Sequence, residues 1–232
     1  MSQSPTAMLP WNEIDTVLLD MDGTLLDLHF DSHFWLEYLP ACYARHHGQT
    51  LEWAKAEIYG IMNARRGQLE WYCLDYWTRE LGLPVAELKR DVAHLISLRP
   101  DAEAFLKALQ RSGRQVILIT NAHRDALSLK LERVELRTYF QRLISSHDFG
   151  FPKEAQAFWV ALQAEVPFDA ERTLFIDDSL DILRSAGRYG VAHLLAVRKP
   201  DSSQPERDTQ EFAAVEDYAV LTSALQAALV AG

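Results

Sequence analysis

The sequence predicts an α/β protein with a doubly wound, Rossmann-like parallel sheet, interrupted after its first strand by a small all-helical insert. Two observations lead to this prediction. Short uninterrupted runs of Val, Ile and Leu, typical of strands buried on both faces, alternate with amphipathic helical stretches along most of the chain. Between residues 27 and 98, in contrast, the apolar residues have helical spacing only. Alternating strands and helices form a parallel sheet with right-handed crossovers.

Apolar runs that end in or near polar side chains are the expected strands. They cover residues 16–20, 115–120, 142–146, 173–177 and 192–197. The helices expected between and after them cover residues 101–112, 124–136, 154–165, 179–189 and 211–230. Gly113 and Gly190 stand where a helix commonly ends. Residues 200–210 are rich in Pro, Ser and Asp and predict an exposed loop.

The insert is expected to fold as several helices. An apolar stripe around Pro40 has helical spacing, although this proline should bend or divide the helix. A later helix is expected to stop at Gly82, and Pro84 stands where the next one can start. We therefore expect an α/β core made of residues 1–26 and 99–232, and a helical cap domain made of residues 27–98.

Composition and charge exclude several classes of protein. With 33 Asp and Glu against 23 Lys and Arg, the 232-residue chain has a net charge of −10, and 48% of its residues are hydrophobic. This balance excludes disorder as a description of the whole chain and argues against nucleic-acid binding. The sequence shows neither a membrane span nor a secretory signal, and Cys42 and Cys73 are expected to be reduced thiols. We expect a cytoplasmic protein; its oligomeric state is left open.

Chemically active side chains gather at the carboxyl ends of the expected strands, where open parallel sheets bind their ligands. In chain order they are Asp20, Asp22, Thr120, Asn121, Lys153, Asp177 and Asp178. Four carboxylates and one ammonium sum to −3, which buried groups do not tolerate without compensation. Mg²⁺ would bring this sum to −1, and a proton on Asp22 would bring it to zero. The arithmetic favours a magnesium site that accepts a small phosphorylated substrate.

Each of these side chains also has an ordinary structural explanation. An Asp at the end of a strand often caps the next helix, Thr120 and Asn121 could form a turn, and a single Lys such as Lys153 is usually solvated. His123 and His147 fall near the expected edge, where a ligand role and a structural role are equally open.

The set of motifs, in this order and on these elements, resembles the haloacid dehalogenase-like phosphohydrolases. The motifs are Asp20-x-Asp22-Gly23-Thr24, Thr120 after a strand, Lys153, and Asp177-Asp178 after a strand. The resemblance covers the alternating core, and the helical insert resembles the family's cap domain. It implies a phosphomonoesterase that depends on Mg²⁺ and forms an aspartyl-phosphate intermediate.

The resemblance also assigns roles to individual residues. Asp20 would be the nucleophile, and Asp22 would protonate the leaving oxygen and then activate water. Asp20, Asp178 and the main-chain carbonyl of Asp22 would bind Mg²⁺, with Asp177 beside the metal, directly or through water. Thr120, Asn121 and Lys153 would bind the phosphoryl group of the substrate. Gly23 would permit the turn that aims both aspartates at one point.

Substrate choice must come from the insert and from the loops that face it. Residues 27–98 hold 11 of the chain's 24 aromatic residues. Most should build the core of the insert, but a few could stack on a base; the candidates are Phe30, Phe34, Trp71, Tyr72 and Tyr76.

Longer strings, including Trp71-Tyr-Cys-Leu-Asp-Tyr-Trp and Phe149-Gly-Phe-Pro-Lys-Glu, resemble bacterial purine 5′-nucleotidases that act on GMP and IMP. A phosphatase of sugar phosphates or phosphoglycolate is the alternative, and a phosphomutase is a weaker one. A dehalogenase is disfavoured because its reaction has no use for Asp22 or the metal carboxylates. A catalytically idle binding protein on this fold would be expected to lose Asp20 or Asp22.

Overall fold

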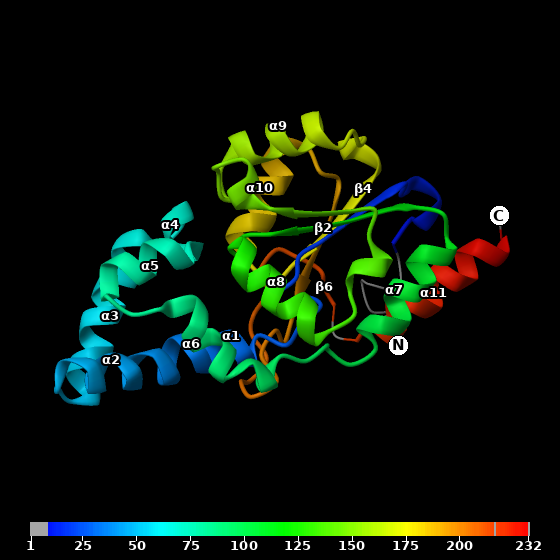
Figure 1. The fold of residues 1–232 in the computed structure, drawn as a ribbon. Coiled ribbons are helices and arrows are strands. Elements are labelled where there is room, and N and C mark those ends of the chain that lie inside the picture. Colours follow the sequence, from blue (N-terminus) through cyan, green and yellow to red (C-terminus); the bar gives the residue numbers. More distant parts are fainter. Residues whose placement is uncertain (1–8, 216, 232) are drawn as a thin grey trace.

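A six-stranded sheet forms the centre of the protein in a computed structural model that describes residues 9–215 and 217–231 (Figure 1). Every neighbouring pair of strands is parallel, and the order across the sheet is β3-β2-β1-β4-β5-β6. The strands are β1 (Thr16–Leu19), β2 (Gln115–Thr120), β3 (Arg142–Ser145), β4 (Thr173–Asp177), β5 (His193–Val197) and β6 (Ala214–Val215). The predicted fold class is confirmed.

Alternate residues of each central strand enter two different cores. In β1, Val17 and Leu19 pack in a core with α7 (Ala102–Arg111), α8 (Arg124–Arg133) and α11 (Tyr218–Ala231). Leu18 points to the other face, into a core with α9 (Gln156–Glu165) and α10 (Leu180–Tyr189). Both faces of the sheet are therefore covered, as the continuous apolar runs require.

Residues 29–91 form six helices that lie to one side of the sheet, at its carboxyl edge (Figure 1). They are α1 (His29–His33), α2 (Leu39–His47), α3 (Leu51–Arg65), α4 (Leu69–Tyr72), α5 (Leu74–Leu81) and α6 (Val85–Asp91). A π-helical turn, Phe34–Tyr38, joins α1 to α2. It lies directly before α2, whose second residue is Pro40, and the missing N–H of this proline cannot continue the normal helical ladder. As expected, α5 ends at Gly82, which has a left-handed φ of 65°.

One expectation near the C-terminus is wrong. The helix expected over residues 211–230 begins only at Tyr218, because Ala214–Val215 pair with Ala196–Val197 as a sixth strand. The loop expected at residues 200–210 is present and mostly exposed, but Asp201 within it is 3% exposed, and its side chain accepts hydrogen bonds from Ser203. A polar segment can be buried where such local hydrogen bonds satisfy it.

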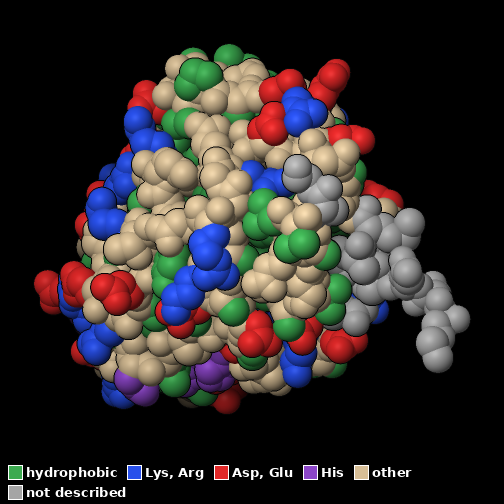
Figure 2. Space-filling model, turned by 90° about the vertical axis from the view of Figure 1, so that its right-hand side faces the viewer, with side chains coloured by type: hydrophobic (Ala, Val, Ile, Leu, Met, Phe, Trp, Pro, Cys, Tyr) green, Lys and Arg blue, Asp and Glu red, His purple; other side chains and the backbone are tan. Residues whose placement is uncertain are grey.

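The surface away from the helices α1–α6 carries charged side chains of both signs, as the composition of the chain leads one to expect (Figure 2). Acidic and basic side chains are interspersed on the face that Figure 2 shows, which is the side away from α1–α6. None of the helices in the described part of the chain has the length and apolar character needed to cross a lipid bilayer.

Candidate active site

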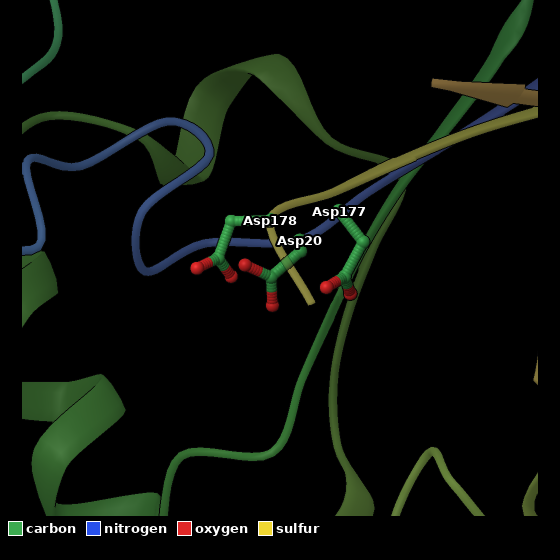
Figure 3. Close-up of side chains that lie close together, drawn as sticks. All are labelled: Asp20, Asp177 and Asp178. Atoms are coloured by element: carbon green, nitrogen blue, oxygen red, sulfur yellow. The ribbon is translucent and has the colours of Figure 1, made fainter. Parts of the chain in front are cut away.

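Three carboxylates meet at the carboxyl edge of the sheet. Asp20 directly follows β1, Asp177 ends β4, and Asp178 is the next residue (Figure 3). One oxygen from each lies within 4.8 Å of the others. Because β1 and β4 are adjacent and in register, their ends bring Asp20 and Asp177 together without any further folding device. We call Asp20, Asp177 and Asp178 the acidic cluster.

Lys153 supplies the positive charge nearest to this cluster. Its Nζ donates hydrogen bonds to Oδ1 of Asp20 at 2.6 Å and to Oδ2 of Asp177 at 2.7 Å, and its residue is 1% exposed. It also donates to the main-chain oxygen of Ile119 at 3.3 Å. Asp177 has a second task, since its Oδ1 accepts a hydrogen bond from the N–H of Ser179 at the start of α10. The structure thus brings Lys153 to the predicted place.

The acidic cluster holds more negative charge than Lys153 alone can balance. Burial raises the pKa of Asp20 to about 7, and the Lys153 ammonium opposes this rise only in part. Burial and the neighbouring Asp20 raise the pKa of Asp178 to about 7, and burial raises the pKa of Asp177 to about 6. Three ionised carboxylates and one ammonium sum to −2, which one divalent cation would cancel. The donor set, oxygen atoms only, fits the preference of Mg²⁺.

Gly23 makes room for this arrangement. Its φ is +79°, and a Cβ atom added there would lie 2.8 Å from Cγ of Asp178. The prediction that this glycine permits the turn after Asp20 agrees with the φ angle. The close approach to Asp178 was not expected, because the sequence gives no sign of which side chain from another strand faces the turn.

Thr120 is the last residue of β2 and Asn121 follows it, and both line a cavity at this edge of the sheet, described below. The hydroxyl of Thr120 accepts a hydrogen bond from the N–H of Ala122. Oδ1 of Asn121 accepts from the N–H of Lys153 at 2.9 Å, and its Nδ2 donates to Glu154 at 3.0 Å. Asn121 therefore fixes the segment that carries Lys153, and its binding of substrate stays a prediction.

Asp22 belongs to a different set of contacts from the acidic cluster. Its carboxylate forms an ion pair with Nζ of Lys130 at 2.6 Å, and Lys130 also donates to Oδ2 of Asp31 at 2.7 Å. The other oxygen of Asp31 accepts from Lys89 at 2.6 Å. We call these four residues, Asp22, Lys130, Asp31 and Lys89, the bridging chain. A metal contact from the main-chain carbonyl of Asp22 stays a prediction.

Sequence reasoning missed Lys130, Asp31 and Lys89. A weak signal existed for the lysines: Lys130 follows Ala126 by four positions and Lys89 follows Val85 by four, so each lies on the apolar face of its helix. In the structure Lys130 is 1% exposed and Lys89 is 2% exposed. Lysines are almost never so buried unless they are paired.

A cavity of about 380 Å³ opens between the strand ends and the helices α1–α6. It is lined by Asp20, Asp22 and Lys153, and on the helical side by Trp35, Trp71 and Tyr72. Of the five aromatic candidates for stacking, only Trp71 and Tyr72 line it. Phe30, Phe34 and Tyr76 are buried in the core beside it, and Trp35 was missed.

Three further contacts surround the cavity. Tyr72 of α4 donates a hydrogen bond to Glu154 at 2.6 Å, which joins the helical side to the segment of Lys153. His123 lines the cavity and stacks edge-on against His147, whose pKa is lowered to about 4 by burial. Arg207, in the loop that was expected to be exposed, reaches to 3.6 Å from Asp178.

Comparison with known sequences supports this arrangement. A profile of haloacid dehalogenase-like hydrolases matches residues 14–190. The chain is 41% identical over 221 residues to the GMP/IMP nucleotidase YrfG of Escherichia coli. The aligned region covers 94% of this chain and 98% of the relative. The chain is also 27% identical over 124 residues to a ribulose-1,5-bisphosphate 5-phosphatase of Halopiger xanaduensis, about half of each chain.

Solved structures share the fold. The HAD phosphatase from Thermococcus onnurineus superimposes with a TM-score of 0.75 at 19% identity, covering 91% of this chain and 98% of that one. An L-2-haloacid dehalogenase from Xanthobacter autotrophicus superimposes with a TM-score of 0.62 at 14% identity, covering 92% and 98%. Phosphatases and dehalogenases thus share this architecture, so the side chains of the site must decide the chemistry.

Proposed function

The chain belongs to the haloacid dehalogenase-like hydrolase family, and from this premise we propose that it is a Mg²⁺-dependent phosphomonoesterase that works through an aspartyl-phosphate. The observation that carries the proposal is the meeting of Asp20, Asp177, Asp178 and Lys153 at one sheet edge, with Asp22 two residues from Asp20. A dehalogenase would need neither the surplus of buried carboxylates nor Asp22.

The acidic cluster would hold the metal. Asp20, Asp178 and the main-chain carbonyl of Asp22 would be the ligands, with Asp177 in direct or water-mediated contact. When bound, Mg²⁺ would neutralise charge on the phosphate and polarise its oxygens. The surplus of −2 in the cluster is the observation that supports a divalent cation.

In the first half-reaction, a carboxylate oxygen of Asp20 forms a bond to phosphorus while the bond from phosphorus to the ester oxygen breaks. Asp22 gives its proton to that leaving oxygen. Lys153 holds the nucleophile at 2.6 Å and, with Thr120, stabilises the negative charge of the phosphoryl oxygens.

In the second half-reaction, Asp22 takes a proton from water, whose oxygen attacks phosphorus. The bond from phosphorus to Asp20 then breaks, which releases phosphate and restores both aspartates. A phosphomutase would share the first half and return the phosphoryl group to a sugar hydroxyl instead.

Residues 27–98 would form the cap domain, and residues 1–26 and 99–232 the core. The two connections between them run side by side: the N–H of Asp27 donates to the oxygen of Ser97 at 3.0 Å, and that of Arg99 to Leu25 at 2.9 Å. Paired connections of this kind would allow the helices α1–α6 to swing as one unit over the cavity.

The preferred substrates would be purine nucleoside 5′-monophosphates, GMP and IMP. Identity of 41% across nearly the whole chain to a GMP/IMP nucleotidase supports this choice, as do Trp35, Trp71 and Tyr72 in the cavity wall. A sugar-phosphate phosphatase is the second candidate, favoured by the weaker and partial similarity to a ribulose-1,5-bisphosphate 5-phosphatase. The cytoplasmic location stays a prediction.

Phosphate release from a panel of esters tests both levels of the proposal. The panel contains GMP, IMP, AMP, CMP, glucose 6-phosphate and phosphoglycolate, each with Mg²⁺ and with chelator. We expect activity only with Mg²⁺ and the highest kcat/KM for GMP and IMP. A higher kcat/KM for glucose 6-phosphate or phosphoglycolate would overturn the nucleotidase assignment and leave the phosphatase chemistry.

A further inference from the structure

The bridging chain connects the cap to Asp22 through alternating charges. Lys89 comes from α6, Asp31 from α1, Lys130 from α8, and Asp22 from the turn after β1. Successive contacts measure 2.6 Å (Lys89 to Asp31), 2.7 Å (Asp31 to Lys130) and 2.6 Å (Lys130 to Asp22). With Asp22 ionised, the two ammonium groups and two carboxylates of the bridging chain sum to zero, so their charges balance without a ligand.

The surroundings of Lys89 make it a poor ligand for a substrate, although it lines the cavity. Its Nζ lies 4.7 Å from the ring centre of Phe30, 4.6 Å from that of Phe34 and 5.4 Å from that of Trp35. Its side chain is 3% exposed. Cation–π contacts and one carboxylate already occupy this ammonium. Lys89 therefore acts on the site through Asp31.

Lys130 stands between the cap and Asp22. One carboxylate from each side faces its ammonium, and its side chain is 2% exposed. If Asp31 moves away, Lys130 loses half of its ionic partners, and a buried charge pair that loses a partner rearranges or is strongly destabilised. The placement of the Asp22 side chain consequently depends on whether α1 and α6 are seated against α8, with which α6 is in contact.

We infer that Lys130 and Asp31 are positioning residues that hold the Asp22 carboxyl toward the leaving oxygen, and that Lys89 makes this hold depend on the seated cap. The inference rests on the proposed function, in which Asp22 delivers a proton to the leaving group. It adds that Asp22 is held in position to deliver its proton only when α1 and α6 of the cap bring Asp31 into contact with Lys130 and Lys89 into contact with Asp31.

Two substrates separate this role from a merely structural one. The alkyl oxygen of a nucleotide leaves poorly unless it is protonated, whereas p-nitrophenolate leaves without a proton at neutral pH. Loss of positioning at Asp22 should therefore lower kcat for GMP and spare kcat for p-nitrophenyl phosphate. General damage to the site should lower both alike.

The test compares Asp31→Asn and Lys89→Met with the parent enzyme. For each we expect kcat for GMP to fall by at least about tenfold and by no more than about 10⁴-fold, the upper end of a general acid's contribution. KM should change little, and kcat for p-nitrophenyl phosphate should stay within about threefold of the parent, well short of that contribution. Lys89→Arg keeps the cation and should recover most of the loss. Lys55→Met, which removes an exposed ion pair with Glu37 in the same helical region, is the control and should change neither substrate.

A double-mutant cycle sharpens the test. In an Asp22→Asn background, Asp31→Asn should cause no further loss of kcat for GMP, because both changes act on the same step. Equal losses for both substrates, or a full additional loss in the Asp22→Asn background, would overturn the inference while the proposed function stands. If the parent enzyme hydrolyses neither ester, the proposed function falls and this inference falls with it. Circular dichroism and Tm identify any variant that does not fold, and the variant that does fold then carries the test through its ratio of kcat for GMP to kcat for p-nitrophenyl phosphate.

Discussion

The acidic cluster and the bridging chain hold the same residue types in different proportions. The acidic cluster has three carboxylates around the ammonium of Lys153, a sum of −2. The bridging chain has two of each, a sum of zero. Both line the same cavity, and each combines nearly buried lysines with carboxylates that are up to 20% exposed, so the difference lies in charge balance and not in exposure.

The balance changes how the carboxylates behave. Burial raises the pKa of Asp20 and Asp178 to about 7, because one ammonium does not compensate three acids. In the bridging chain the two carboxylates differ: two ammonium groups outweigh burial at Asp31 and hold its pKa well below the usual range, whereas burial raises the pKa of Asp22, which is paired with Lys130 alone. The surplus of negative charge in the acidic cluster favours the binding of a cation, whereas the raised pKa of Asp22 favours the binding of a proton, as a general acid requires.

The largest expected effect comes from a change in the acidic cluster, whose charges are not balanced. Asp20→Asn should lower turnover by more than about 10⁴-fold, the scale on which the loss of a catalytic nucleophile is felt. Its amide has the same shape but does not attack phosphorus, so circular dichroism and Tm should show an intact fold. Asp181→Asn, an exposed acid at the start of α10, is the control. Turnover of Asp20→Asn within tenfold of the parent would contradict the assignment of the nucleophile.

The second effect is the dependence on metal. Chelator should abolish phosphate release and Mg²⁺ should restore it, because the acidic cluster and a phosphate cannot share one site without a cation. Ca²⁺ should bind and inhibit, since its looser and larger coordination would misplace the attacking carboxylate. Full activity in excess chelator would refute the metal assignment. Tm should respond to chelator far less in an Asp178→Asn variant, because this change removes one carboxylate of the acidic cluster.

The acidic cluster was readily predictable from the sequence, and the bridging chain was not. Asp20, Asp177 and Asp178 follow strands whose parallel register alone brings them together. The bridging chain depends on how helices pack: Lys89 meets Asp31 across 58 positions and Lys130 meets it across 99. Helical periodicity shows which face of a helix is buried but not which residue of another helix lies opposite.

Two other misses have the same origin. The sixth strand is only two residues long, Ala214–Val215, and such a short run carries no periodic signal. Arg207 reaches Asp178 from a polar loop whose composition resembles any exposed loop. In both cases tertiary contacts, which local patterns do not encode, decide the outcome.

The third effect is a pH dependence of stability. Asp20, Asp177 and Asp178 have folded pKa values of about 7, 6 and 7, above the 3.8 of an unperturbed Asp. A group with a raised folded pKa contributes stability that is fully present below pH 3.8 and is lost as the pH rises through 6 to 7. The metal-free protein should therefore lose stability from these groups between pH 5.5 and pH 8.

Mg²⁺ should offset this loss, since it compensates the carboxylates once they are ionised. We expect the rise in Tm on adding Mg²⁺ to be at least about 2 °C larger at pH 8 than at pH 5.5, the scale of 1 kcal/mol for a chain of this size. Differential scanning fluorimetry with and without Mg²⁺ measures it, and Asp178→Asn should shrink the difference. Equal shifts at both pH values would mean that the acidic cluster does not take up the cation.

The last effect concerns substrate choice, and it depends on the ion pairs of the bridging chain. Because Lys89 and Lys130 are already paired, aromatic side chains are left to distinguish a base from a sugar, and stacking on one is worth about 1–3 kcal/mol. Trp71→Ala should therefore lower kcat/KM for GMP by about 5- to 150-fold, the equivalent of that energy, and lower it less for p-nitrophenyl phosphate. Trp53→Ala, which removes a ring stacked on Tyr43 and not part of the cavity lining, is the matched control. If both esters lose equally in Trp71→Ala, this tryptophan supports the cap without contacting the base, and the lysines of the bridging chain become the candidates for reading it.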